Sequence, residues 1–113
     1  MVFKPCAAFL YVALASAAVP YGEAAAVTVC KPPFVLRLAS EMDEVCVPIP
    51  TRHRTVAENA RAPLLWAPGS YGPKTCAQGY VWREAFAGDT VCVVPAIRTE
   101  TLQDNAAAPL RKQ

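Results

Sequence analysis

The chain is poor in the residues that build the commonest metal and catalytic sites. Its only histidine is His53, and no two cysteines lie as close together as the ligand pairs of structural zinc sites. It has no glycine-rich phosphate loop, and its basic residues are scattered rather than clustered. These absences predict a protein that is not an enzyme, holds no metal ion or cofactor and binds no nucleic acid.

A long hydrophobic run is also missing. The apolar stretch Ala7 to Val19 has 13 residues, fewer than the roughly 20 that cross a bilayer as a helix. It follows Lys4 and precedes the small residues Ala24 to Ala26, an order typical of a secretory signal peptide. We expect residues 1–26 to be a signal peptide that is cleaved after Ala26; cleavage after Ala17 is the alternative. Either cleavage would leave no membrane anchor and give a secreted, periplasmic or extracellular chain.

An internal duplication organises the remaining sequence. A shift of 46 positions aligns residues 30–64 with residues 76–110 without a gap, and 15 of the 35 aligned pairs are identical. A period of this kind indicates two copies of one supersecondary unit. We therefore expect a degenerate first repeat at 27–65, a connector rich in Pro, Gly and aromatic residues at 66–75, a second repeat at 76–110 and a frayed polar tail at 111–113.

The cysteine count agrees with export. Removing residues 1–26 also removes Cys6 and leaves four cysteines: Cys30, Cys46, Cys76 and Cys92. An even number in a short exported chain indicates disulfides. Three pairings are possible, and the duplication favours one bridge within each repeat, Cys30–Cys46 and Cys76–Cys92. Each bridge would stabilise the fold by roughly 3 kcal/mol, which units of about 35 residues need because their cores are small.

Two periodicities follow each other within each repeat. Identity at every second residue indicates one face of a β-strand, and it predicts hairpins that pair 34–39 with 45–47 and 80–86 with 91–94. The next identities recur at helical spacing, and Pro63 and Pro109 set the limit of each helix. The predicted fold is a small α+β domain, disulfide-stapled and built of two tandem strand-turn-strand-helix repeats.

Charged and amide residues occupy the identical faces. We expect each helix to lie on the Val35/Arg37/Ala39 face of its own hairpin, or on the equivalent face in the second repeat. Asp43 and Asp89 would then meet one of the two sets of arginines in a buried structural network. The predicted members of this network are Arg37, Arg83, Asp43, Asp89, Arg52, Arg98, Asn59 and Asn105. A ligand site made of the same residues is the alternative.

The opposite hairpin faces differ between the repeats. The first carries Phe34, Leu36 and Leu38, whereas the second is aromatic with a polar end. These faces either pack on each other as a shared core, or leave an aromatic surface for a ligand. The candidate binding residues are Tyr80, Trp82, Glu84, Trp66 and Tyr71.

The second copy also contains a long motif. It runs from Cys76 through Gly79-Tyr80-Val81-Trp82-Arg83-Glu84-Ala85 to Asp89, then through Val91-Cys92-Val93 to Pro95 and Arg98. The motif resembles a cysteine-paired repeat of uncharacterised secreted bacterial proteins, often found in tandem. The resemblance covers about 35 residues and implies secretion and repeat organisation, but no activity. The first copy departs from it at Pro33, Leu36 and Leu38.

The best-supported function at this stage is that of a non-enzymatic binding module. Its partner is unknown, with a cell-envelope glycan, a peptide or another protein as candidates, because aromatic side chains bind such ligands through large, stiff apolar faces. A spacer domain without a ligand is the first alternative. A small cell-envelope hydrolase that uses Glu84, with Asp89 as a possible second carboxylate, is the other alternative.

Overall fold

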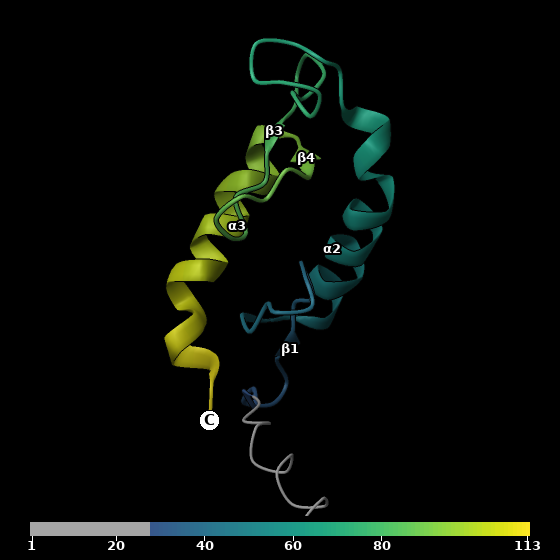
Figure 1. Ribbon diagram of the computed structural model, residues 1–113. Helices are drawn as coiled ribbons and strands as arrows, with labels where there is room; N and C mark the ends of the chain where they lie inside the picture. The colour runs from purple at the N-terminus through teal and green to yellow at the C-terminus, as the bar shows by residue number, and fades with distance from the viewer. Residues whose placement is uncertain (1–27) are drawn as a thin grey trace, which may run out of the picture.

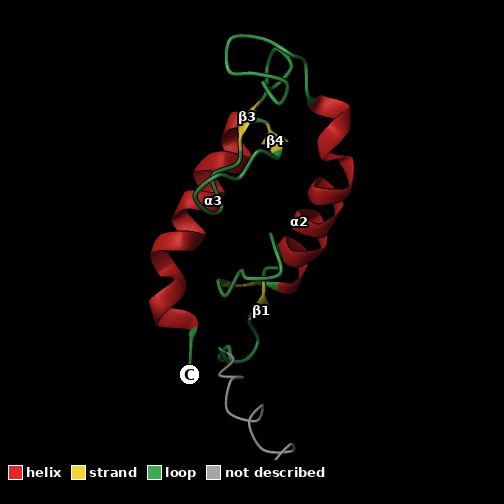
Figure 2. Cartoon of the chain, in the orientation of Figure 1, coloured by secondary structure: helices red, strands yellow, loops and turns green. Residues whose placement is uncertain are grey.

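Two similar strand–strand–helix units follow each other along the chain, in a computed structural model that describes residues 28–113 (Figure 1). The first contains β1 (Val35–Leu36), β2 (Cys46–Val47), helix α2 (Ile49–Arg61) and the 3-10 helix η2 (Ala62–Leu65). The second contains β3 (Val81–Trp82), β4 (Cys92–Val93), helix α3 (Pro95–Ala107) and the 3-10 helix η3 (Ala108–Arg111). The predicted α+β class is confirmed, and Figure 2 shows how little of the chain is strand.

Each strand pair is antiparallel but shorter than the sequence predicts. Val35 lies opposite Val47, and Val81 lies opposite Val93. The first strand of each hairpin is interrupted because Leu38 and Glu84 adopt left-handed backbone conformations, with φ of 65° and 63°. A side chain with a Cβ rarely takes this conformation, which turns the chain out of the extended path. Alternation in the sequence therefore continues beyond the regular strands.

Proline sets the limits of both helices. Pro50 lies at the second position of α2 and Pro95 at the first position of α3, where a missing N–H breaks no intrahelical bond. The α-helices end at Arg61 and Ala107, shortly before the next prolines, as predicted. A 3-10 turn follows each helix and leads the chain back toward the other unit.

The disulfides join Cys30 to Cys46 and Cys76 to Cys92. This is the pairing that the duplication favours, with Cα–Cα distances of 5.7 and 5.6 Å. Each bridge ties the N-terminal segment of a unit to its second strand. Every unit is thus closed by its own covalent link, and the predicted disulfide-stapled fold is confirmed.

Backbone hydrogen bonds between the units are reciprocal. The start of each unit pairs with the segment that follows the helix of the other, and every bond has an equivalent 46 positions away. The bonds are Lys31 N to Arg111 O (2.8 Å), Ala77 N to Leu65 O (2.8 Å), Gln113 N to Val29 O (2.9 Å) and Ala67 N to Thr75 O (2.7 Å). The two helices flank the hairpins and run in opposite directions (Figure 1). The units are therefore related by an approximate twofold axis.

These bonds overturn the prediction of a frayed tail. Arg111 and Gln113 take part in the reciprocal pairing, and Lys112 forms an antiparallel bridge with Cys30. The tail is held because the first unit offers it the same backbone partners that the second unit offers the connector. The C-terminal residues thus complete the first unit.

Two buried arginines also lie at the contact between the units. The Nη2 atom of Arg37 donates to the carbonyl of Ala85 at 3.2 Å, and that of Arg83 donates to the carbonyl of Ala39 at 3.5 Å. The hydrophobic residues that are buried are all small, so Arg37 and Arg83 are the largest fully buried side chains. The centre of the fold is consequently polar rather than a large apolar core.

This arrangement corrects the predicted orientation of the hairpins. Arg37 and Arg83 of the identical faces reach the other hairpin across the twofold axis, although each helix also contacts the first strand of its own hairpin. The variable faces do not form a shared core, since Leu38, Tyr80 and Phe86 are all exposed. The physical reason is that a twofold contact must be self-complementary, so both copies have the same residues there.

The twofold symmetry fails at one buried position. Glu58 of α2 accepts a hydrogen bond from Arg83 Nη1 at 3.2 Å. Its counterpart Asp104 is one methylene shorter and pairs instead with Arg111, at 3.0 Å. Arg37 Nη1, the atom equivalent to the one that Glu58 contacts, is buried and has no hydrogen-bond partner among the described residues.

We expect Glu58→Asp to lower the free energy of unfolding by about 1 to 3 kcal/mol, because it leaves Arg83 Nη1 as unpaired as Arg37 Nη1. Asp104→Glu is the matched variant at the equivalent position, and it should change stability by less than about 1 kcal/mol, because a new bond to Arg37 Nη1 would replace the existing pair with Arg111. Urea denaturation followed by circular dichroism measures both changes. Equal effects of the same sign would contradict this explanation of the asymmetry.

The structure bears on export in one respect. The predicted signal peptide, residues 1–26, lies outside the described residues. Within residues 28–113, no helix has the length and apolar character needed to cross a membrane. Together with the two disulfides, this is consistent with a secreted or extracellular protein, because disulfides persist in oxidising compartments.

Candidate functional site

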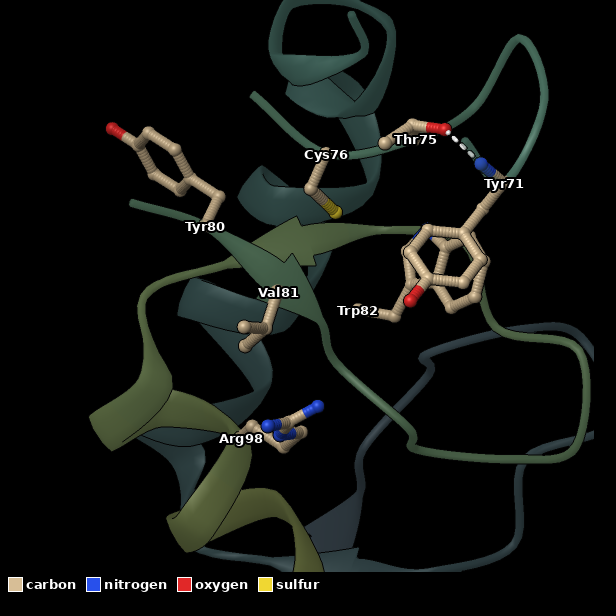
Figure 3. A pocket seen from close by; sticks show the side chains of 7 residues that line it. All are labelled: Tyr71, Thr75, Cys76, Tyr80, Val81, Trp82 and Arg98. Atoms are coloured by element: carbon tan, nitrogen blue, oxygen red, sulfur yellow. Dashed lines mark hydrogen bonds between the residues drawn. The ribbon is translucent and has the colours of Figure 1, made fainter. Parts of the chain in front are cut away.

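An open groove of about 430 Å³ lies on the second unit. Figure 3 shows the side chains that line it, which come from the connector, from the segment around β3 and from the first turn of α3. They are Tyr71, Thr75, Cys76, Tyr80, Val81, Trp82 and Arg98. We call this surface the aromatic groove. It brings together three of the five candidate binding residues, namely Tyr71, Tyr80 and Trp82.

A tight turn in the connector positions Tyr71. Gly69 and Gly72 exchange two backbone hydrogen bonds of 3.1 and 3.0 Å around it, and Gly72 has a φ of 101° that favours glycine. The Thr75 hydroxyl accepts a hydrogen bond from Tyr71 N at 3.0 Å and donates one to Gly72 O at 2.7 Å. The Tyr71 backbone is therefore fixed, although its side chain is 76% exposed.

Trp82 forms the floor beneath Tyr71. Its indole N–H donates to the carbonyl of Lys74 at 2.9 Å, which orients the ring. The ring of Tyr71 lies edge-on to that of Trp82, with centroids 5.7 Å apart (Figure 3), a favourable geometry for aromatic pairs. Tyr80 lies on the far side of the groove and directs its hydroxyl away from this pair (Figure 3). The groove thus has Tyr71 and Trp82 on one side and Tyr80 on the other (Figure 3).

Trp66 and Glu84 do not line the aromatic groove. The Trp66 indole N–H donates to Thr90 O at 2.8 Å, and Lys74 Nζ lies 4.8 Å from the centroid of its ring. Trp66 therefore holds the connector against the second unit. Glu84 borders a neighbouring hollow of about 570 Å³ that shares Trp82 with the groove, and its carboxylate accepts from Arg98 at 3.1 Å.

Asp43 and Asp89 use their carboxylate oxygens to hold the turns of their own hairpins. Asp89 accepts hydrogen bonds from Arg83 Nε at 2.8 Å and Nη2 at 3.2 Å, and from the backbone N–H groups of Ala85 and Val91. Asp43 accepts the equivalent four bonds in the first unit. Of the two sets of arginines that the sequence left open, the aspartates meet Arg37 and Arg83.

The remaining network residues connect each helix to its own hairpin. Arg52 Nε donates to Leu36 O at 2.7 Å, and Asn59 Nδ2 donates to Leu38 O at 3.0 Å. Asn105 Nδ2 donates to Glu84 O at 3.3 Å. Each asparagine thus donates a hydrogen bond to the carbonyl group of a left-handed residue, Leu38 or Glu84. The left-handed conformation turns this carbonyl group away from the hydrogen bonds between the strands. Arg98 departs from this pattern, since its partner is a side chain.

Sequence reasoning missed the role of two residues and misplaced that of a third. Glu58 and Asp104 were overlooked because only identities between the copies were considered, although both positions are acidic. Arg98 was predicted solely as a network residue, because it matches Arg52. The available signal was at another position, where Glu84 replaces Leu38 and thereby offers Arg98 a different partner.

The described residues offer little for catalysis or metal binding. Glu84 is exposed, whereas the side chain of Asp89 is fully buried and paired, so the two do not form a free acid–base pair. Among residues 28–113, no three His, Cys, Asp or Glu side chains are grouped closely enough to hold a metal ion. Comparison with known proteins finds no family model that matches this chain, and no curated protein or solved structure that is significantly similar to it.

Proposed function

We propose that this chain is an exported, non-enzymatic binding module whose ligand docks on the aromatic groove. The observation that carries the proposal is that an exposed aromatic side chain lies on a fixed backbone. Tyr71 is 76% exposed, whereas its backbone and the Trp82 indole are held by hydrogen bonds. A preorganised aromatic surface loses little conformational entropy on binding. Export is supported by the disulfides and by the resemblance of the second unit to repeats of secreted bacterial proteins.

The difference between the units supports a binding role over a purely structural one. Leu36 and Phe34 occupy the positions of Trp82 and Tyr80 in the first unit. Arg111 lies over the Phe34 ring, 4.8 Å from its centroid, and covers part of that surface. Among the described residues of the second unit, Tyr71 and Tyr80 are exposed, at 76% and 36%. A spacer of two equivalent units would have no need for this difference.

Tryptophan fluorescence tests the proposal. We expect Trp66→Phe, in which Trp82 is the only tryptophan, to be quenched by acrylamide and to show a saturable change with soluble glycan fragments or peptides. The reciprocal variant Trp82→Phe keeps Trp66, which lies outside the groove with its indole N–H bonded to Thr90 O, and should show no saturable change. A shielded Trp82 that responds to no glycan or peptide probe would overturn the proposal and favour a spacer domain.

A further inference from the structure

Arg98 and its counterpart Arg52 have different hydrogen-bond partners, so the twofold symmetry is broken at this position. In the first unit, Arg52 Nε donates to the backbone carbonyl of Leu36. In the second unit, Arg98 lines the aromatic groove, and the only hydrogen bond of its side chain among the described residues runs from Nη1 to Glu84. The Arg98 and Glu84 side chains are 36% and 53% exposed. Arg98 thus has donor groups available to a ligand.

The groove has one charged lining side chain, whose counter-charge belongs to the neighbouring hollow. Arg98 is the only ionised side chain among its seven lining residues, since Glu84 borders the neighbouring hollow instead. A guanidinium group presents a planar fork of donors that matches the two oxygens of a carboxylate. A groove with one such group and no lining carboxylate favours a ligand that carries a negative charge.

The aromatic walls restrict the shape of that ligand. Figure 3 shows Tyr71 and Trp82 together on one side of the groove and Arg98 apart from them, so the ligand needs both a flat apolar face and a negative group at another point of the same molecule. A pyranose ring has such a face, formed by its C–H groups, and a uronic acid carries a carboxylate on the same ring. A volume of about 430 Å³ is within the usual range for small-ligand sites.

We propose that the aromatic groove binds an acidic saccharide, with a sugar ring stacked on Trp82 and its carboxylate paired with Arg98. This inference rests on the proposed function and names the class of ligand. Glu84 holds Arg98 in the free protein, and the carboxylate of the sugar replaces it on binding. Glu84 is therefore a competitor for the site rather than a catalytic residue.

Removing this competitor gives an unusual expectation. In Glu84→Gln, the neutral amide no longer competes for Arg98, so affinity for an acidic sugar should rise by about two- to fivefold. In Arg98→Gln, affinity should fall by about tenfold, the value expected for loss of a charge-assisted pair. If Glu84 were a hydrolytic acid, Glu84→Gln would instead abolish turnover of the sugar.

Calorimetric titration of the full chain with trigalacturonate tests the proposal. A neutral trisaccharide of the same size and a peptide ending in phenylalanine are the comparison ligands. We expect trigalacturonate to bind at least about tenfold more tightly than the neutral sugar, with the preference lost in Arg98→Gln and weakened by salt. Arg52→Gln in the first unit is the matched control and should retain the preference, with folding of each variant checked by its melting temperature.

The outcomes separate failure of the ligand class from failure of the site. Equal binding of both sugars, or tighter binding of the peptide, that is lost in Trp82→Ala would overturn the acidic saccharide but keep the groove as the site. Binding unaffected by Trp82→Ala would overturn both the ligand class and the proposed function. Absence of binding by trigalacturonate in folded protein would likewise overturn the acidic saccharide.

Discussion

Replacing Asp89 by asparagine is expected to lower the free energy of unfolding by about 3 to 5 kcal/mol. The side chains of Asp89 and Arg83 are 0% and 1% exposed, and their closest N–O distance is 2.8 Å. The variant leaves the Arg83 guanidinium buried without its full counter-charge. It also replaces one acceptor oxygen by an NH₂ group, although both carboxylate oxygens accept backbone N–H bonds. A loss of this size is a large part of the stability of a small domain.

Chemical denaturation of the full chain measures this effect. The control is Glu100→Gln, which removes an ion pair between half-exposed Arg54 and exposed Glu100 at 2.7 Å. Such surface pairs contribute about 1 kcal/mol or less. A change below about 1 kcal/mol in Asp89→Asn would mean that the Arg83–Asp89 pair is hydrated and does not hold the second hairpin.

Opening the Cys76–Cys92 bridge is expected to have the second large effect. Cys76→Ser with Cys92→Ser should lower the free energy of unfolding by about 2 to 5 kcal/mol, the usual consequence of losing a native disulfide in a small exported domain. The buried hydrophobic side chains are no larger than valine, so packing offers little compensation. Reduction of both bridges with dithiothreitol should unfold the chain.

Thermal melts with and without reductant measure the contribution of the disulfides. Because each unit supplies backbone partners to the other, we expect the serine variant to melt in one transition at a lower temperature. Two separate transitions would show that the units fold independently. A melting temperature unchanged by dithiothreitol would contradict the requirement for the bridges.

The sequence predicted the content of each unit well because local signals agree there. Proline marks both ends of the helices, alternation marks the hairpins, and the 46-residue offset selects the disulfide pairing. The strand lengths could not be predicted, since the left-handed conformations of Leu38 and Glu84 have no glycine or asparagine to indicate them. Such a conformation depends on tertiary contacts, including the asparagine that binds each carbonyl group.

The relation between the units was predicted wrongly for a physical reason. Identity of Arg37 with Arg83 shows that both positions are constrained, but the same identity results from packing on a helix or from contact across a twofold axis. The difference is decided by partners distant in sequence, such as Ala85 for Arg37. The candidate groove depends on the same information, because Tyr71, Trp82 and Arg98 line it from separate segments.

A double-mutant cycle between Glu58 and Arg83 tests the central claim, that the units are joined through buried polar contacts across the twofold axis. Glu58→Gln and Arg83→Met remove the two partners, which lie in different units and are 3.2 Å apart. Denaturation of the single and double variants gives the coupling energy, which we expect to exceed about 1 kcal/mol. Stability changes that add to within about 0.3 kcal/mol would contradict this arrangement of the two units.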